Sequence, residues 1–560
     1  MKTAMLTGVF YGILFVTTHM AASENLDIKK LPEEEQSLSS TVDPWGLAFS
    51  DQLVRFQRYF ATATNASFVV GYTHNLIKIW RNKYWFRGVE AIAPGAAKEM
   101  KPLWGVAGSV VSFQVAILPR TGAMASHYHV TVQAPVPTRV FREEFIKVGA
   151  APYPRFESVY WPDPLIPDND CELSGIWAGV FWVDVVVPTD FGPRNFKVEV
   201  RVTADGGDQA TFTVPVELVK LKPDPPDFHL VAWFNKGKLN NVQFDAMCNM
   251  ALEHHLEPLT QRELTALWST NRQEKFEQRV QSLIRKGQRV FQIEKPDPAL
   301  YDFLVKKGWI DRFMIYSNAD EPSESTFRAK NIPWAKEIKK SFPGLKIFLA
   351  SEFYPDMREG CDIWLTDISS ANYDPRSFVP AAKPQLWHYY CHLPINWQMR
   401  APLTLAPNIL IDNTALEHRM ALWMSWHYGA KGVFIYAGNS GWTALGTNFW
   451  SCPDLSGNEY RTAYKFPYGG IHHGNGLLVY PPRTPDGEPI TSIRLKVLRD
   501  GMQDIALFES AVRKYGESAQ ALISPVPDVF QHPHYYDRLP EALLGKRESL
   551  LRGIRELEVR

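Results

Sequence analysis

The sequence predicts two joined domains, an N-terminal antiparallel β-sandwich followed by a (β/α)8, TIM-like barrel. Three observations support this prediction. Apolar and polar residues alternate with period two until about residue 220, a proline-rich segment follows, and beyond it short apolar runs alternate with amphipathic stretches. Period-two alternation is typical of strands that bury one face, whereas strands alternating with helices are typical of a parallel sheet.

The composition limits the classes of partner. A chain of 560 residues is too long for one ordinary domain. Lys and Arg together number 60, and so do Asp and Glu, so the formal net charge is zero. A neutral chain has no basic surface of the kind that binds polyanions, and we expect no nucleic-acid partner. The 18 Trp and 22 Tyr either supply stacking platforms for sugar rings or fill large cores.

The first 23 residues are typical of a secretory signal peptide. Lys2 precedes an apolar run over 4–16, and small residues follow at 21–23. An uncleaved anchor is the alternative. Later stretches fall short of about 18 uninterrupted apolar residues, so we expect no stable membrane insertion and a secreted, lumenal or periplasmic protein. The polar and acidic residues 24–44 predict a flexible lead-in.

The sandwich is expected over residues 45–222. Along 111–117 and 196–203, apolar residues alternate with polar or small ones, as in strands with one buried and one wet face. Many short strands with Pro- and Gly-bearing turns, and almost no helical period, favour an antiparallel sandwich. Three prolines within residues 223–227 favour a stiff, extended linker between the domains.

The barrel is expected over residues 228–515. Eight apolar runs, separated in most cases by amphipathic stretches, predict a closed (β/α)8 barrel. The second run is weak, which leaves an incomplete or irregular barrel as an alternative. The runs are 228–234, 256–259, 289–293, 312–316, 346–350, 362–366, 385–391 and 432–436.

Two C-terminal segments are predicted to be amphipathic helices. Residues 492–514 place apolar side chains on one helical face, which suits packing on the barrel. Residues 516–560 form a predicted helical tail. The apolar face of 540–560 in that tail either docks on this chain or pairs with another.

Cysteines and histidines give no support for a metal site or a cofactor. The five cysteines are an odd number, so at least one thiol is unpaired unless it pairs with another chain. The sequence holds no CxxC and no HExxH, and the adjacent His472 and His473 would point apart in an extended chain. We therefore expect neither a metal nor another cofactor.

Asp320 and Glu321 follow the fourth predicted strand. Pro322 has no N–H, so it is expected to close that strand and leave the two acids on the following turn. In barrel enzymes, the loops after strands carry catalytic side chains. The alternative is a helix start, where the helix dipole favours acids. Other strand ends and loops should converge on the same face, and they bring Trp233, Asn235, Asp367, Trp387, Tyr389, His392, Tyr436, Asn439 and Trp442.

Five motifs in one order resemble glycoside hydrolase family 123. They are YWPDPLIP at 160–167, the DEP turn at 320–322, LWHYYCHLP at 386–394, GNGLLVYPP at 474–482 and SIRLKVLRDGMQD at 492–504. The resemblance implies a β-N-acetylgalactosaminidase in which a sandwich precedes a (β/α)8 catalytic domain. The family also includes relatives whose activities are unassigned.

The resemblance also implies a division of labour between the two acids. Glu321 would be the general acid and then the base, and Asp320 would accept the acetamido N–H of the substrate, whose own oxygen is the nucleophile. A neighbouring negative charge raises the pKa of a glutamate in the direction that this role needs. Trp387, Tyr389 and Trp442 are candidates for stacking, Tyr389 or Tyr436 for donating to the acetamido oxygen, and Asn439 and His392 for contacting hydroxyls.

The leading functional hypothesis is therefore a secreted, retaining exo-glycosidase. Its substrate would be a glycolipid or glycoprotein glycan with terminal β-linked N-acetylgalactosamine. Two alternatives remain beside it: a glycosidase of another specificity, and a carbohydrate-binding protein without turnover.

Overall fold

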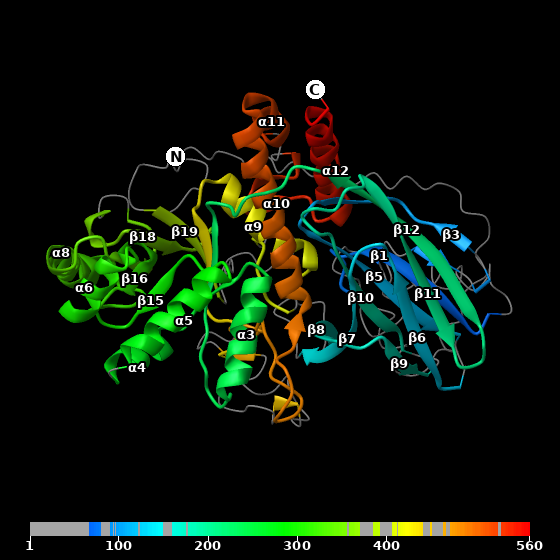
Figure 1. Cartoon of the computed structure of the whole chain (residues 1–560), viewed down its shortest axis with the longest axis horizontal. Helices are drawn as coiled ribbons and strands as arrows, with labels where there is room; N and C mark the ends of the chain where they lie inside the picture. Colours follow the sequence, from blue (N-terminus) through cyan, green and yellow to red (C-terminus); the bar gives the residue numbers. More distant parts are fainter. Residues whose placement is uncertain are drawn as a thin grey trace, which may run out of the picture.

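The computed structural model shows two lobes joined by one long helix (Figure 1). The predicted signal peptide and lead-in, together with His392, Trp442 and Cys452, lie outside the described residues. The structure describes residues 66–79, 90–92, 94–95, 97–120, 124–148, 159–174, 177–270, 272–354, 358–369, 385–391, 406–411, 413–440, 449–450, 463–465, 471–524 and 528–559.

The first lobe is a sandwich of a seven-stranded and a six-stranded sheet, in the orders β2-β1-β5-β10-β7-β8-β23 and β3-β12-β11-β6-β9, with β4 also pairing β12. Most pairs are antiparallel, while β3 and β4 run parallel to β12. The strands are β1 (Phe68–His74), β2 (Glu90–Ile92), β3 (Ala97–Glu99), β4 (Leu103–Val106), β5 (Val110–Pro119), β6 (Ser126–Gln133), β7 (Thr138–Val148), β8 (Val159–Ile166), β9 (Asp170–Leu173), β10 (Gly179–Val186), β11 (Asn195–Ala204), β12 (Gln209–Val219) and β23 (Thr491–Ser492).

The alternation predicts one sandwich strand correctly and another only in part. On β11, Val198, Val200 and Val202 are buried while the residues between them are at least partly exposed. The expectation of a wet face on β5 is wrong, because Ser112 and Gln114 are buried as well. Their polar groups are satisfied inside the protein: the Ser112 hydroxyl donates to Asp184, and the Gln114 amide donates to the carbonyls of His74 and Ile77. The second lobe and its helices cover this face.

The second lobe contains all eight predicted barrel strands, all parallel, in the order β14-β13-β20-β19-β18-β17-β16-β15. The strands are β13 (His229–Trp233), β14 (Glu257–Leu259), β15 (Phe291–Ile293), β16 (Phe313–Tyr316), β17 (Lys346–Ala350), β18 (Ile363–Thr366), β19 (Gln385–Tyr390) and β20 (Gly432–Ile435). The helices are α3 (Asn241–Glu253), α4 (Gln261–Ser269), α5 (Gln273–Arg285), α6 (Pro298–Lys306), α7 (Glu324–Thr326), α8 (Ile332–Ser341) and α9 (Ala415–His427).

Side chains bridge the barrel where its backbone ladder is missing. Among the described strands, no ladder joins β14 to β15, and Pro258 in β14 has no N–H to donate. The Glu257 carboxylate accepts from the backbone N–H groups of Arg289 (2.7 Å) and Val290 (3.0 Å), and the Gln288 amide donates to the Pro258 carbonyl (2.9 Å). Burial alone would raise the pKa of Glu257, but His229 and Arg289 lower it to about 2. The weak second strand thus belongs to a nearly closed barrel.

The helix α10 (Ile493–Tyr515) lies between the two lobes and binds both (Figure 1). Its Arg494 pairs with Asp163 of β8 at 2.8 Å, and its Arg499 pairs with Asp184 of β10 at 2.9 Å. Its Asp504 accepts from Arg419 of α9 at 2.6 Å. Just before α10, β23 adds an edge strand to the sandwich sheet. The segment predicted as barrel therefore also completes the sandwich.

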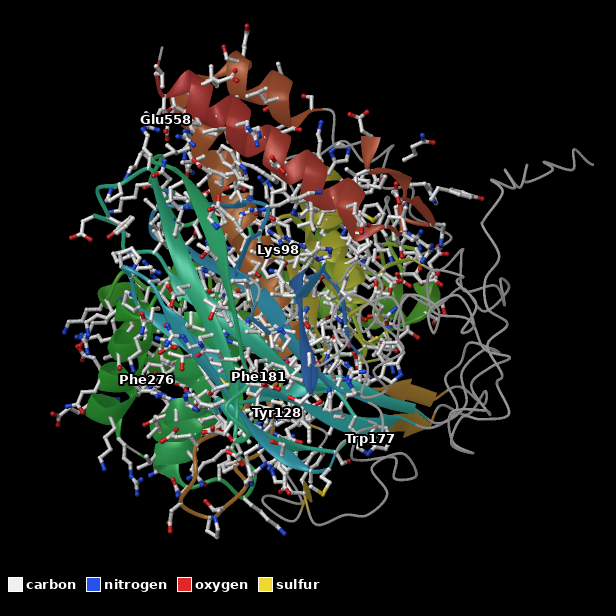
Figure 2. All side chains as sticks on the ribbon, turned by 90° about the vertical axis from the view of Figure 1, so that its right-hand side faces the viewer. Lys98, Tyr128, Trp177, Phe181, Phe276 and Glu558 are labelled. Carbon is white, nitrogen blue, oxygen red and sulfur yellow. The ribbon has the colours of Figure 1, made fainter. Side chains whose placement is uncertain are left out.

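The C-terminal tail docks on this chain. It comprises α11 (Glu517–Ile523), a hairpin of β24 (Phe530–His532) and β25 (Tyr535–Tyr536), and α12 (Pro540–Leu557). In α12, the side chains of Leu543, Leu550, Leu551 and Ile554 are buried. Figure 2 shows α12 crossing one end of the sandwich, whose core holds Tyr128 and Phe181. Beyond α12, Glu558 accepts from Arg194 at 2.7 Å and from the Leu221 N–H at 2.5 Å, which fixes the tail at the start of the linker.

Candidate active site

Asp320 and Glu321 lie in a loop between a barrel strand and the next helix. β16 ends at Tyr316, six residues before Pro322, so the expectation that Pro322 closes the strand is wrong. The helix α7 begins at Glu324 and is capped by Ser323, whose hydroxyl accepts from the Thr326 N–H. The acids therefore precede the helix and do not occupy its first turn. We call residues 317–323 the acid loop.

The acid loop holds Glu321 in a strained backbone conformation. Glu321 has a φ of +40°, and among the described residues only one other residue besides glycines, His255, has a positive φ. A side chain at positive φ is disfavoured, and a following proline disfavours it further. Such strain persists only where surrounding contacts enforce it, and it is concentrated at functional sites.

Asp320 is bound by a tyrosine that is itself fixed in place. The Tyr316 hydroxyl donates to the Asp320 carboxylate, and the Ala350 N–H donates to the same hydroxyl oxygen at 3.2 Å. Burial and the carboxylate of Asp320 raise the pKa of Tyr316, so the hydroxyl keeps its proton and acts as the donor.

The carboxyl group of Glu321 has a different environment from that of Asp320. No described residue pairs with its carboxyl group, and its side chain remains accessible to solvent. Burial of the carboxyl and then the negative charge of Asp320 raise its pKa. The raised pKa favours the protonated form of Glu321, which is the form that a general acid needs.

Aromatic side chains from three strand ends pack together beside Tyr316, which binds Asp320. The Trp233 ring lies edge-on to Tyr316 (5.7 Å between centroids), Phe434 (4.9 Å) and Tyr436 (6.2 Å). The Trp233 Nε1–H donates to Gln292 of β15 at 2.6 Å, which fixes the indole. Sequence reasoning placed Trp233 on this face. It missed Tyr316 and Gln292. The only indication that the sequence gives for these two residues is that each lies at or near the end of a predicted barrel strand.

Tyr389 is the predicted binding residue that the structure brings to the acids, while Tyr436 lies against Trp233. Tyr389 lies near the carboxyl-terminal end of β19 and packs against Phe434 (6.0 Å between ring centroids). Burial first, and then the nearby Cys391, Tyr316, Glu321 and Asp320, raise the pKa of Tyr389. Its hydroxyl therefore stays protonated and can donate.

Trp387 and Asn439 serve structural roles, which corrects their assignment to substrate contacts. Trp387 is 1% exposed and stacks on His229, which begins β13, so it fills the amino-terminal end of the barrel. Asn439 is fully buried, and its amide accepts from the Asn235 N–H (3.0 Å) and donates to the Asn235 carbonyl (2.6 Å). It holds the loop after β13 and has no free group for a sugar hydroxyl.

A third carboxyl follows β18 on the same face of the barrel. Asp367 accepts from the Ser369 N–H at 2.8 Å and from the Ser369 hydroxyl at 2.9 Å. Burial of the carboxyl, only partly offset by these bonds, raises its pKa to about 6. Across the described residues, no cluster of three or more His, Cys, Asp or Glu side chains could hold a metal ion.

Comparisons with known proteins give a family match and a similar fold. Residues 292–511 match the family model described as glycoside hydrolase 123, catalytic domain. A solved family 123 glycoside hydrolase from Clostridium perfringens, described in terms of glycolipid glycan hydrolysis, aligns at 12% identity with a TM-score of 0.63, over 88% of this chain and 98% of that chain. A Bacteroides ovatus xyloglucanase of family GH5 aligns at 9% identity over 72% of this chain and 98% of that chain, with a TM-score of 0.21, too low to indicate a common fold. No curated protein matches the chain.

These findings confirm the resemblance to glycoside hydrolase family 123 and the fold of a sandwich followed by a TIM-like barrel. The family match supports glycoside hydrolase activity, and a glycoside hydrolase acts on glycans. No described helix is long and apolar enough to span a bilayer.

Proposed function

We propose that this chain is a secreted, retaining exo-glycosidase that removes terminal β-linked N-acetylgalactosamine, with the acetamido group of the substrate as nucleophile. One observation carries the proposal: two adjacent acids, one bound by Tyr316 and the other with a raised pKa, lie on the loop after the fourth strand of a barrel that matches the family 123 catalytic domain. The predicted signal peptide supports secretion, where glycans are accessible.

The adjacency of the acids favours a nucleophile from the substrate. Retaining enzymes with their own nucleophile hold two carboxyls about 5–5.5 Å apart across the sugar, and inverting enzymes hold them further apart. Asp320 and Glu321 follow one another on a single loop, and Asp320 is already bound by Tyr316. In this geometry, Asp320 is better suited to accept a hydrogen bond than to attack the anomeric carbon from the opposite side.

The reaction would proceed in two steps, formation and then hydrolysis of a cyclic intermediate. The acetamido oxygen attacks the anomeric carbon while the bond to the leaving oxygen breaks, and Glu321 gives its proton to that oxygen. The product is an oxazolinium ion, whose N–H donates to the ionised Asp320. Glu321, now a carboxylate, then takes a proton from water, and the water oxygen attacks the anomeric carbon, which restores the acetamido group with net retention.

The surrounding residues would supply binding. Trp233 and Tyr436 offer aromatic surface for the N-acetyl methyl, and such rings provide large apolar contact area. Tyr389, with its raised pKa, can donate to the acetamido oxygen and so orient it for attack. A fixed donor at a position where charge develops stabilises the transition state without reorganisation.

The substrate assignment draws on the Clostridium perfringens relative, whose description concerns glycolipid glycans. We extend that class to this chain and include glycoprotein glycans with the same terminal sugar. A specificity for another sugar in the same fold is the closest alternative, because the acid pair recognises the acetamido group and not the 4-hydroxyl.

A panel of aryl β-glycosides tests the proposal. The purified mature chain is assayed with the N-acetylgalactosaminide, N-acetylglucosaminide, galactoside and glucoside. We expect turnover of the N-acetylgalactosaminide, weaker turnover of the N-acetylglucosaminide and none of the two sugars without an acetamido group. Turnover of galactoside or glucoside would contradict the mechanism, and inactivity on all four would favour a carbohydrate-binding protein.

A further inference from the structure

The helix that follows the acid loop contains one wide turn. Helical dihedral angles continue from α7 through the π-helical segment η4 (Phe327–Asn331) into α8, so the three form one helix. Within η4, the Ile332 N–H donates to the Phe327 carbonyl five residues earlier, instead of the usual four. Turns of this kind are rare and are found frequently at functional sites.

The sequence explains where the wide turn lies. Pro333 follows it directly, in the first turn of α8. A proline inside a helix has no N–H to donate, and its ring clashes with the carbonyl four residues earlier, here that of Ala329. Widening the turn before Pro333 moves that carbonyl away. The consequence is a shift of register that directs Asn331, the last residue of the wide turn, toward the acid loop.

Asn331 is fully buried, and both hydrogen bonds of its amide nitrogen go to the acid loop. Its Nδ2 donates to the Ser317 hydroxyl oxygen at 2.7 Å and to the Ala319 carbonyl at 3.2 Å. Ser317 is also tied to the barrel, because its backbone N–H donates to the Phe348 carbonyl of β17 at 3.0 Å. Ala319 immediately precedes Asp320, so the amide holds the chain at the point where the two acids begin.

The other atom of the amide has no partner. The Oδ1 of Asn331 is buried without a hydrogen bond. Reversing the amide would not help, since the Ala319 carbonyl requires a donor. A buried polar atom without a partner costs stability, so the amide is not placed here for the best hydrogen bonding of Asn331 itself.

We infer that Asn331 is a positioning residue for the acid pair. By holding the Ala319 carbonyl, it keeps Asp320 within reach of Tyr316 and keeps Glu321 at its strained positive φ. Contacts must enforce that strain, and a proline-induced wide turn that presents a buried amide to the loop is such a contact. The inference deepens the proposed function and rests on it, because positioning has a measurable consequence only if the acids turn over substrate.

Two substitutions test the inference by separating catalysis from folding. Asn331→Leu has similar volume and no amide, while Asn331→Asp keeps the shape but cannot donate to the Ala319 carbonyl. Misplacement of a reacting group by about 1 Å can cost about 10²-fold in rate. We expect both variants to lose about 10²-fold in kcat on the aryl N-acetylgalactosaminide, with little change in KM. The alkaline limb of the pH profile should move to lower pH, because a released loop loses the partial burial that raises the pKa of Glu321.

Ala335→Gly provides a matched control. Ala335 is buried on α8 of the same helix and has no side-chain hydrogen-bonding group that could hold the acid loop, so its substitution should lower the unfolding temperature without changing kcat per folded molecule. If the Asn331 variants behave like this control, keeping kcat and the pH profile while losing stability, the positioning role is overturned. If the Leu variant does not fold, Asn331→Asp supplies the kinetic comparison. An active wild type with unaffected variants refutes this inference alone, whereas an inactive wild type refutes the proposed function as well.

Discussion

Carboxylates occupy two contrasting environments in this protein. Buried cations from α10 surround Asp184 of β10. Lys496 and Arg499 approach its oxygens at 2.5 Å and 2.9 Å. Although burial alone would raise it, Arg499 and Lys496 hold the pKa of Asp184 well below its usual range. At the barrel mouth, no described cation pairs with Asp320 or Glu321, and the pKa of Glu321 is raised. The charges around Asp184 are paired, whereas Glu321 at the mouth is available for proton transfer.

The same contrast appears in the backbone. The α10 layer is built from regular helix and strand, with Ser492 capping the helix through its hydroxyl and the Leu495 N–H at 3.1 Å. The acid loop instead holds a glutamate at positive φ. Regular backbone and paired charges suit a helix that joins two lobes. Backbone strain beside an accessible acid is typical of an active site.

Glu321→Gln should give the largest effect at the mouth. General acid catalysis contributes about 10²- to 10⁴-fold, and most to substrates with poor leaving groups. We expect loss in that range for a natural disaccharide linkage and a much smaller loss for an activated aryl glycoside. Steady-state kinetics on both substrates measure the difference. Equal loss on the two would remove Glu321 as the acid.

Breaking the buried pair of Asp163 and Arg494 should affect folding instead of chemistry. Both side chains are fully buried, and removing one partner of such a pair costs about 3–5 kcal/mol. We expect Asp163→Asn to lower the free energy of unfolding by this amount in denaturant titration, with kcat per folded molecule unchanged. The exposed pair Glu548–Arg552 on α12 is the control, since Glu548→Ala should cost no more than about 0.5 kcal/mol.

Tyr316→Phe should have an intermediate effect on the activity. It removes the hydrogen bond to Asp320 and leaves the ring in place, but it also removes the acceptor of the Ala350 N–H. A hydrogen bond to a charged group contributes about 1.5–3 kcal/mol, which corresponds to about 10- to 100-fold in rate. We expect a fall in kcat of that size, measured per folded molecule, together with a lower unfolding temperature because the Ala350 N–H is left without an acceptor. A variant with wild-type kcat would show that Asp320 does not depend on Tyr316.

The pH profile should respond to the neighbouring charge. Glu321 must be protonated to act as an acid, so the rate should fall as pH rises through its raised pKa. The negative charge of Asp320 is one cause of that raised value, so Asp320→Asn should move the alkaline limb of kcat/KM to lower pH. The residual activity of this variant, measured across pH, tests the coupling. An unmoved limb would mean that burial alone sets the pKa.

The sequence predicts the positions of the strands better than it predicts how far along the barrel axis each inward-facing side chain lies. Trp387 and Tyr389 lie two residues apart on β19, so both face inward, as alternation predicts. Two residues advance about 6.6 Å along a strand, which is enough to put Trp387 at the amino-terminal end of the barrel and Tyr389 beside the acids. Periodicity carries no information on that distance. The buried second face of β5 was missed for a related reason, since the helix and barrel that cover it come later in the chain.

The strain in the acid loop also could not be read from the sequence. Asp-Glu-Pro suggests either a strand end or a helix start, and the structure shows a loop between the two. Asn331 binds Ala319 and Tyr316 binds Asp320, the two residues immediately before Glu321, and the Ala350 N–H binds Tyr316 from a third element. Local propensity cannot report a conformation that distant contacts enforce.

The most direct test of the central claim is inhibition by N-acetylgalactosamine-thiazoline, a stable mimic of the oxazoline intermediate. If the acetamido group is the nucleophile and Asp320 binds its nitrogen, the wild type should be inhibited competitively, with a Ki well below the KM of the aryl substrate. Asp320→Asn should lose most of this affinity. A wild type that turns over the aryl N-acetylgalactosaminide but is insensitive to the thiazoline would contradict the mechanism.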